Sequence, residues 1–509
     1  MSQPVYGWRG SAKRHVPTVE GKHRPRSRGG PVSTESQTAH DAAPASTRET
    51  SLRLDVRKGR WIEHWDPEDT HQWEREGRTV ARRNLRWSVF AEFLGFVVWQ
   101  LWSIVVVQLP AAGFAFDTAQ TFWLLSMPSL VGATLRIPYT FMVSRFGGRN
   151  WTIVSALLLL IPAMGLAACV SNASTPFWLM LAVAGLAGFG GGNFASSMAN
   201  ITFFFPAKEK GWALGLNAAG GNLGAAVAQL AVPVAVGLTA ALLTGAHGAT
   251  LAVAGLMWIP LILVAAFGAW RNMDNLSHAK GDVAGSLAAL KEPHLWVIAF
   301  LYVGTFGSFI GFGGVFPKLI HDIFPAYSTF TLHAASVPVA LSLAFLGPLV
   351  GSLARPYGGR LADRFGGARI TVASFAAMAL TTLAVIATLP LKSFWLFLGL
   401  FLVLFAASGI GNGSTYRMIP AIFATSSRAA RAGTAPSYTA RLASAALGLI
   451  SAIGAYGGFV IPQVLGASSS STGSYVPAFF GFVGAYVLML AVSWACYLRR
   501  GARAARAGV

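Results

Sequence analysis

Two arginines lie inside long apolar segments, where a charged side chain is costly. Arg136 and Arg355 are each expected two to three turns within a membrane helix. A charge at that depth normally faces a cavity or a partner. Acidic side chains are almost absent from these segments, and Glu92 is the exception. If the two arginines face each other, the missing counter-charge is a small anion from outside, held by charge and planar geometry.

Snorkelling of both arginines to the inner surface is the alternative. It leaves unexplained why the same position recurs in both halves of the chain. Gly132-Ala-Thr-Leu-Arg136 corresponds to Gly351-Ser-Leu-Ala-Arg355 at a separation of 219 positions. The same separation relates the Arg-Phe-Gly-Gly runs at 145–148 and 364–367, and it carries Gly190, Gly192 and Asn193 onto Gly409, Gly411 and Asn412. We therefore predict an internal repeat with one arginine in each half.

The composition indicates that helices in a membrane carry these arginines. Of 509 residues, 54% are hydrophobic and only 11% are charged, which disfavours a soluble enzyme. The apolar residues form blocks of about 20 or more, enough for a helix to cross a bilayer. We predict an all-α integral membrane fold with twelve helices in two pseudo-symmetric six-helix halves. The predicted spans are 88–112, 119–143, 151–171, 176–204, 212–243, 249–270, 294–318, 330–354, 368–390, 393–423, 441–467 and 474–498.

The distribution of basic residues predicts the orientation. The formal net charge is +20, but the basic residues gather in the tails and in alternate loops. That pattern indicates membrane topology and no nucleic-acid partner. With the N-terminus inside, the outer loops hold only Lys318 and Lys392 as basic residues. We therefore expect a multi-pass protein of the cytoplasmic membrane with both termini in the cytoplasm.

The segments outside the spans differ in character. We expect residues 1–60 to be a disordered cytoplasmic tail, because they are too polar to build a core. A juxtamembrane amphipathic segment, 61–87, should begin a helix with Asp66 as cap and Pro67 in the first turn, and enter the membrane at Trp87. The remaining predicted units are an N-terminal half at 88–270, a central cytoplasmic loop at 271–293, a C-terminal half at 294–498 and a basic cytoplasmic tail at 499–509.

Amides, aromatic rings and glycines complete a candidate anion site. Asn222 adds an amide donor without charge, and Tyr302 and Phe306, four residues apart, share a helix face. A lone aromatic residue in a membrane helix is more often core or lipid-facing. Glycines let membrane helices approach closely. Glycine-rich stretches in spans 5 and 11 are expected to act in conformational change, with the candidates Gly220, Gly224, Gly454 and Gly458.

The repeat resembles the plan of major-facilitator transporters, in which two parallel halves are related by an axis along the membrane normal. The loop Gly359-Arg-Leu-Ala-Asp363-Arg364-Phe-Gly is similar to the superfamily signature after spans 2 and 8. The resemblance implies that Asp363 and Arg364 form a latch at the cytoplasmic helix ends. The first-half copy has Ser144 in place of the aspartate and is degenerate.

Three longer motifs resemble the NarK-type nitrate/nitrite porters of that superfamily. They are Gly190–Asn200 (GGGNFASSMAN), Gly211–Asn222 (GWALGLNAAGGN) and Gly454–Pro462 (GAYGGFVIP). The resemblance covers about residues 85–498. It implies that two arginines clamp the anion while an asparagine, a tyrosine and two phenylalanines complete the site. The matching residues are Arg136, Arg355, Asn222, Tyr302, Phe194 and Phe306. Arg417 and Glu92 depart from the family pattern.

These observations predict a carrier of nitrate and nitrite that works by alternating access. We expect nitrate/nitrite antiport, because an empty site with two unpaired arginines should resist closing. Proton-coupled symport through Glu92 is the rival, and Glu92 could instead lie near the inner interface. A carrier of another small anion such as formate, an anion channel and a sensor are further alternatives. The sequence shows no catalytic triad or metal-ligand cluster, so we expect no enzyme activity, metal or cofactor. We also expect the protein to be a monomer in the lipid bilayer.

Overall fold

The computed structural model describes residues 56–242, 247–279, 288–334, 337–427, 433 and 436–499. Residues 1–55 of the predicted tail, 280–287 of the predicted central loop and 500–509 of the basic tail lie outside the described residues. The described residues form one compact unit.

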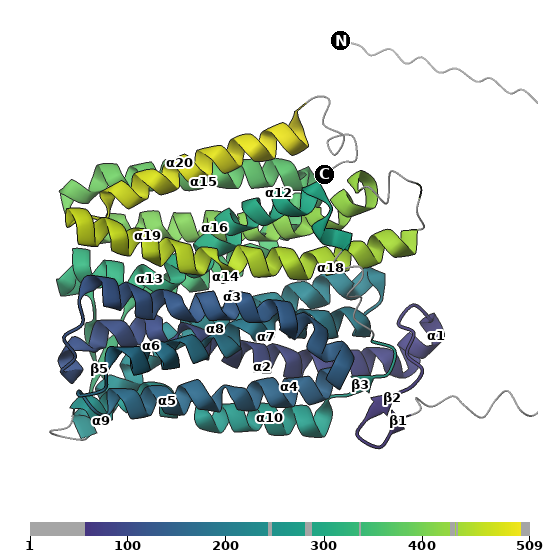
Figure 1. Ribbon diagram of the computed structural model, residues 1–509, viewed down its shortest axis with the longest axis horizontal. Coiled ribbons are helices and arrows are strands. Elements are labelled where there is room, and N and C mark those ends of the chain that lie inside the picture. Colours follow the sequence, from purple (N-terminus) through teal and green to yellow (C-terminus); the bar gives the residue numbers. More distant parts are fainter. Residues whose placement is uncertain are drawn as a thin grey trace, which may run out of the picture. The chain divides into compact units, whose positions relative to one another are not determined.

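Helices dominate the described part of the chain (Figure 1). Among the described residues, ten helical segments are long and apolar enough to cross a membrane: Thr70–Gln108, Gly148–Val170, Phe177–Phe204, Ala207–Leu242, Thr250–Asn272, Pro293–Ile323, Gly367–Leu391, Phe394–Thr425, Ala445–Thr472 and Val476–Leu498. Two further long helices are not among these ten segments: α3 (Thr118–Phe146) and α14 (Leu346–Phe365). They are the helices that carry Arg136 and Arg355. Together the segments are consistent with the twelve predicted spans.

The chain order divides the helices into two groups, which occupy the lower and the upper part of Figure 1. The first group is α2 (Arg78–Val105), α3, α4 (Gly148–Leu158), α5 (Leu160–Val170), α6 (Phe177–Leu186), α7 (Gly188–Phe204), α8 (Ala207–Leu242), α9 (His247–Leu256) and α10 (Ile259–Asn272). The second is α12 (Pro293–Tyr302), the π-helical turn η4 (Val303–Gly307), α13 (Ser308–Ile323), α14, α15 (Gly367–Thr388), α16 (Phe394–Ser426), α18 (Pro436–Ala455), α19 (Gly457–Thr472) and α20 (Val476–Ser493). The groups meet where α3 contacts α18 and α19, α2 contacts α13, and α8 contacts α14.

The repeat has a structural counterpart at the ends of α3 and α14. Each helix ends at the phenylalanine of an Arg-Phe-Gly-Gly run, and the next residue is Gly147 or Gly366. These glycines have φ of 86° and 92°, a conformation that side-chain-bearing residues rarely adopt. The same backbone turn therefore follows the arginine helix in both halves.

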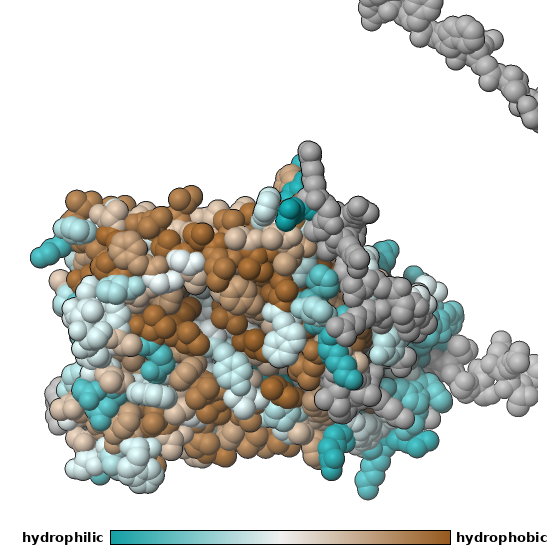
Figure 2. Space-filling model, turned by 45° about the horizontal axis from the view of Figure 1, so that its top comes forward, coloured by the Kyte–Doolittle hydropathy of each residue, from teal (hydrophilic) through white to brown (hydrophobic). Residues whose placement is uncertain are grey.

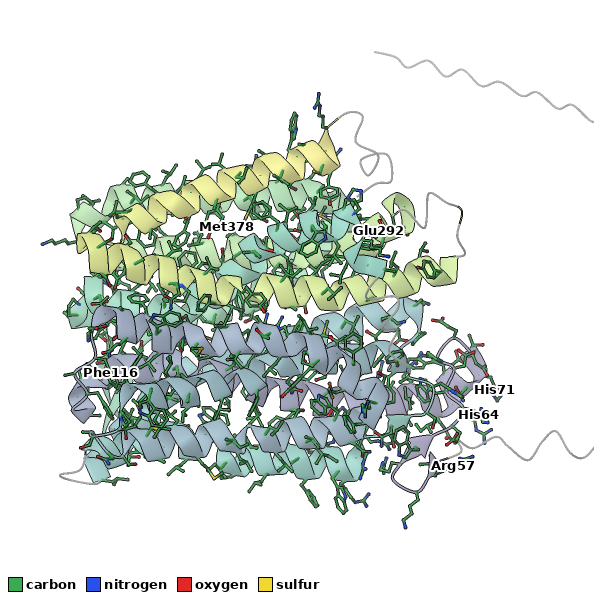
Figure 3. The ribbon with its side chains drawn as sticks, viewed as in Figure 1. Arg57, His64, His71, Phe116, Glu292 and Met378 are labelled. Atoms are coloured by element: carbon green, nitrogen blue, oxygen red, sulfur yellow. The ribbon has the colours of Figure 1, made fainter. Side chains whose placement is uncertain are left out.

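The outer surface of the helices is apolar, as a membrane protein requires. Trp178, Phe267 and Trp395 are each more than half exposed. In Figure 2, hydrophobic side chains cover the flank of the helices, whereas hydrophilic ones gather at the ends. One end carries Arg57, His64 and His71, and Phe116 lies at the other (Figure 3). We call these the α1 end and the hairpin end, after the short helix α1 (Thr70–Gln72) and the hairpin β4–β5 described below.

The start of the first long helix corrects our prediction. Asp69, not Asp66, caps it, and its carboxylate accepts hydrogen bonds from the backbone N–H groups of His71 and Gln72. Asp66 instead accepts from the backbone of Glu68 in the preceding turn. The helix continues through a π-turn, η1 (Trp73–Gly77), into α2, as predicted.

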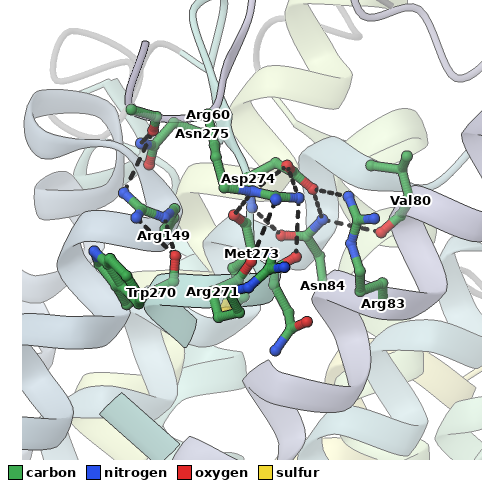
Figure 4. A network of polar contacts seen from close by, with 12 residues as sticks. Arg60, Val80, Arg83, Asn84, Arg149, Trp270, Arg271, Met273, Asp274 and Asn275 are labelled. Atoms are coloured by element: carbon green, nitrogen blue, oxygen red, sulfur yellow. Dashed lines mark hydrogen bonds and ion pairs between the residues drawn. The ribbon is translucent and has the colours of Figure 1, made fainter. Parts of the chain in front are cut away.

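Residues 56–60, predicted to be disordered, form the first strand of a small sheet at the α1 end and the turn that follows it. Strands β1 (Val56–Arg57) and β2 (Trp61–Ile62) are antiparallel, and β2 pairs in parallel with β3 (Asn275–Leu276) of the central loop. Asp274 is buried there and pairs with Arg60 and Arg83, both at 2.7 Å (Figure 4). Arg60 also donates to the carbonyl oxygens of residues 271–273 at the end of α10. The described segment that precedes α2 is thus held against the first group of helices.

The predicted span 330–354 is wrong in its first part. Residues Phe330–Ala334 and Val337–Leu341 form the antiparallel hairpin β4–β5, and the helix α14 begins only at Leu346. Val, Phe and Thr fit strands well, and Pro338 disfavours a helix interior. An apolar run does not by itself distinguish a strand from a helix. The correction places Arg355 in the middle of its helix.

Candidate functional site

Arg136 lies on α3 at the contact between the two groups of helices and is fully buried. Its Nε donates to the carbonyl oxygen of Gly191 on α7 at 3.1 Å, and one terminal nitrogen donates to that of Ser451 on α18 at 3.0 Å. The other terminal nitrogen has no protein partner. The side chain therefore joins both halves and keeps one N–H₂ group unpaired.

Arg355 on α14 is 6% exposed. One terminal nitrogen donates to the Tyr302 hydroxyl at 3.4 Å, and the other has no protein partner. Tyr302 ends α12, directly before the π-helical turn η4. Such turns are rare and frequently occur at functional sites. Both arginines thus hold an unsatisfied donor in the protein interior, where leaving a donor unpaired is costly.

A pair of phenylalanines joins the two arginines. Phe194 of α7 and Phe306 of η4 are stacked, with ring centroids 6.1 Å apart. The Arg136 guanidinium carbon is 4.5 Å from the first ring and 4.9 Å from the second. The corresponding distances from Arg355 are 5.6 and 6.0 Å. Because both arginines share these rings, the structure brings one charge from each half to a single place, with cation–π contacts around it.

Two further aromatic residues belong to this group and were not predicted from the sequence. Trp99 of α2 lies 5.4 Å from the Arg136 guanidinium and donates its indole N–H to the Pro128 carbonyl. Tyr416 of α16 lies 5.6 Å from the Arg355 guanidinium and 6.1 Å from the Tyr302 ring. The only sequence signal for Tyr416 is its place one turn after Asn412 in the repeated motif.

Asn222 is fully buried on α8, and neither its amide nitrogen nor its amide oxygen has a protein partner. It is not bonded to either arginine. Asn222 comes directly after Gly221 in the sequence. The Cα atom of Gly221 faces the Glu92 carboxylate on α2. An uncharged buried amide with both groups free can donate to an anion. No hydrogen bond to another residue fixes the orientation of this amide.

Glu92 is fully buried on α2. Its Oε2 accepts hydrogen bonds from the hydroxyl of Ser197 on α7 and, at 2.7 Å, from the amide nitrogen of Asn217 on α8. Ser88 lies 3.2 Å from Ser197 and extends the cluster. The carboxyl is therefore inside the first group of helices, among neutral polar side chains.

The four candidate glycines occupy different contacts. A side chain at Gly220 or Gly224 would strike Val89 or the backbone of Phe93, both in the first group. At Gly454 it would strike the ring of Tyr302, in the second group. Gly458 alone among the four lies between the groups, where a Cβ would be 2.8 Å from the Ser129 hydroxyl of α3.

Arg417 pairs with the predicted latch residue Asp363, with 2.5 Å between Nε and the carboxylate, and both side chains are about half exposed. The pair joins α14 to α16 and has Gly211 of α8 beside it. Arg364 instead lies over the ring of Phe365. The third arginine of the sequence therefore pairs with a residue of the predicted latch and does not belong to the buried arginine pair.

Other parts of the described chain do not resemble a catalytic site. Among the described residues there is no group of three or more His, Cys, Asp or Glu side chains that could hold a metal ion. A cavity of about 440 Å³ opens toward the hairpin end, lined by residues such as Gln108, Pro233 and His321. None of the buried arginine-site residues lines it.

Two bundles of membrane helices around a buried charged site define a multi-pass membrane transporter. The Major Facilitator Superfamily model matches residues 89–462. The nitrate/nitrite transporter NarU of Escherichia coli (strain K12) is 41% identical over 456 residues, covering 86% of this chain and 96% of that protein. The probable nitrate/nitrite antiporter NarK2 of Thermus thermophilus is 36% identical, covering 87% and 98%.

A solved structure of a bacterial homolog of the human lysosomal transporter Spinster, inward-facing and occupied, aligns with a TM-score of 0.56. It is 18% identical and covers 83% of this chain and 97% of its own, a likeness of fold. The chain therefore belongs to the Major Facilitator Superfamily, and within it to the NarK-type nitrate/nitrite porters.

Proposed function

We propose that this protein exchanges nitrate and nitrite across the cytoplasmic membrane by alternating access. The observation that carries the proposal is the buried pair Arg136 and Arg355, each with one unpaired N–H₂ group beside the same two phenylalanine rings. Relatives with 36–43% identity are named as nitrate/nitrite transporters or antiporters. Both anions are small, planar and singly charged, which suits a site of this charge and shape.

Each site residue has a proposed role in binding. The free N–H₂ groups of Arg136 and Arg355 donate to the anion oxygens, and Phe194 and Phe306 enclose its flat faces. Asn222 adds a neutral donor, since its amide has no protein partner. Tyr302 holds Arg355 in place through its hydroxyl. An anion thus completes bonds that the protein itself leaves unmade.

Charge favours exchange over one-way transport. Without an anion, the closed site holds two guanidinium groups in a medium of low polarity, where their repulsion is strong. A bound anion offsets part of that repulsion. We expect the loaded carrier to change between its two orientations faster than the empty carrier does.

The change of orientation is expected to occur between the two groups of helices. Arg136 bonds to Ser451 across that boundary, and Gly458 lies in the same contact surface. The exposed Asp363–Arg417 pair would act as a latch at the α1 end. We assign that end and both termini to the cytoplasm because basic residues concentrate there. A single chain in the bilayer contains both halves of the site, so we propose a monomer.

Proteoliposomes at equal internal and external pH test the proposal. Vesicles that hold nitrite should take up labelled nitrate at least about tenfold faster than vesicles that hold the same concentration of chloride, a difference of about 1.4 kcal/mol in barrier. Equal rates would rule out exchange. Competition by external formate tests the substrate: formate that displaces nitrate at equal concentration would indicate a general small-anion carrier.

A further inference from the structure

Glu92 is the buried acid that the exchange mechanism does not use. Its carboxyl oxygen Oε2 accepts from two neutral donors, Ser197 and Asn217, and no arginine or lysine pairs with it directly among the described residues. A buried carboxylate without a paired cation is costly unless a proton neutralises it. The cluster therefore differs from the buried ion pairs at the α1 end.

Two unpartnered oxygen atoms of the cluster could bond to each other if Glu92 carried a proton. Glu92 Oε1 and Asn217 Oδ1 are both buried and have no hydrogen-bond partner. Both atoms are acceptors when the carboxyl is ionised, so they cannot bond to each other. A proton on Oε1 converts it into a donor. Because the same two side chains are already joined through Oε2 and Nδ2, a carboxyl–amide pair of this kind can form its second bond once the proton is present.

The cluster is built on the helices that form the anion site. On α2, Glu92 precedes Phe96 by one turn, and Phe96 packs on Phe194. On α7, Ser197 follows Phe194 by three residues. On α8, Asn217 precedes Asn222 by five. The acid is therefore within one or two turns of the residues proposed to hold the anion.

The charged and titratable groups around Glu92 make protonation sensitive to the anion. Arg136 of α3 and Arg355 of α14 interact with its charge, and so does the Tyr416 hydroxyl of α16. The contacts from α7 and α8 are the neutral Ser197 and Asn217. An anion between the arginines offsets their attraction for the carboxylate and favours its protonated form. By linkage, a proton on Glu92 must favour anion binding to the same extent.

We propose that Glu92 is a proton-binding residue that couples protonation to anion binding, so that the carrier takes up one proton with its anion. This rests on the proposed anion transport. The site carries a single net positive charge both when anion and proton are bound and when both are absent. In exchange, the proton travels in both directions and no net proton movement results. With a proton gradient and no internal anion, the carrier must return empty, so net uptake of one anion with one proton is slower than exchange.

Calorimetric nitrate titrations of the purified full chain, in buffers of different ionisation enthalpy between pH 5 and pH 9, test this proposal. The wild type should take up close to one proton per nitrate where Glu92 titrates, and its affinity should fall by up to about tenfold per pH unit there. Glu92→Gln should bind nitrate with no proton uptake and an affinity that changes by less than roughly twofold. Asp322→Asn, an acid at the hairpin end of α13, is the matched control and should behave as the wild type does.

A wild type that binds nitrate without proton uptake at any pH would overturn the proposal, whether or not the variants fold. The same proton uptake in Glu92→Gln as in the wild type would also overturn it. Glu92→Asp keeps a carboxyl and should keep proton uptake, which a merely structural role for Glu92 would not require. If the wild type binds neither nitrate nor nitrite, the proposed function fails first, and this inference fails with it.

Discussion

Gly224→Ala is a sharp test of how closely α2 and α8 must pack. A Cβ at this position would lie 2.2 Å from the backbone oxygen of Phe93, where ordinary contacts begin near 3.4 Å. A backbone atom cannot rotate away, so the helices must separate by about 1 Å. Overpacking of this kind costs about 1–3 kcal/mol. Asn222 lies two residues earlier on the same helix and would move with it.

The expected result combines lost stability with lost transport. A displacement of about 1 Å at a binding residue can lower a rate by about 100-fold. Thermal unfolding in detergent and nitrite-driven nitrate uptake in proteoliposomes measure the two effects. Gly215→Ala on the same helix is the matched control, because a Cβ there meets nothing within 4 Å. If the two alanine variants have equal stability and equal uptake, the close approach of α2 and α8 is not required and the reasoning fails.

Three other variants test separate parts of the structure. Gly458→Ala, whose Cβ would meet Ser129 across the boundary, should slow exchange at least about tenfold while nitrate binding stays within about threefold; unchanged exchange would show that this contact does not move. Asp363→Asn should change the free energy of unfolding by less than about 1 kcal/mol, because its pair with Arg417 is exposed, yet alter the exchange rate severalfold if the pair is a latch. Asp274→Asn should lower the free energy of unfolding, because it breaks two ion pairs of a buried carboxylate. The loss should be less than the roughly 3–5 kcal/mol for breaking a fully buried pair, since the arginine partners of Asp274 are about a third exposed. Chemical denaturation measures this loss, and an unchanged midpoint would contradict the expectation.

The sequence predicted the helices best where a charge or a repeat added information to apolar composition. The 219-residue repeat placed Arg136 and Arg355 correctly in equivalent helices, although neither helix is among the ten described segments that are apolar enough to cross a membrane. Apolar composition alone failed at residues 330–341, because a hairpin and a helix can be equally apolar. Asp66 and Asp69 are both good caps, and only the backbone geometry distinguishes them.

The site was predicted less completely, for physical reasons. The carbonyl groups of Gly191 and Ser451, which orient Arg136, belong to the backbone and leave no mark in residue type. Trp99 and Tyr416 are common residue types in membrane helices, so only their contacts with the arginines single them out. The roles of Phe194 and Phe306 came from the family resemblance, and their stacking between two arginines was not predictable from spacing.

The central claim is that two guanidinium groups, one from each half, clamp the anion. The most direct test measures nitrate and nitrite exchange for Arg136→Lys and Arg355→Lys beside the wild type. Lysine keeps the charge but loses the fork, and each lost charge-assisted hydrogen bond costs about 1.5–3 kcal/mol. Both variants should therefore fold and lose at least about tenfold in apparent affinity for both anions. Wild-type exchange by both variants would contradict the clamp.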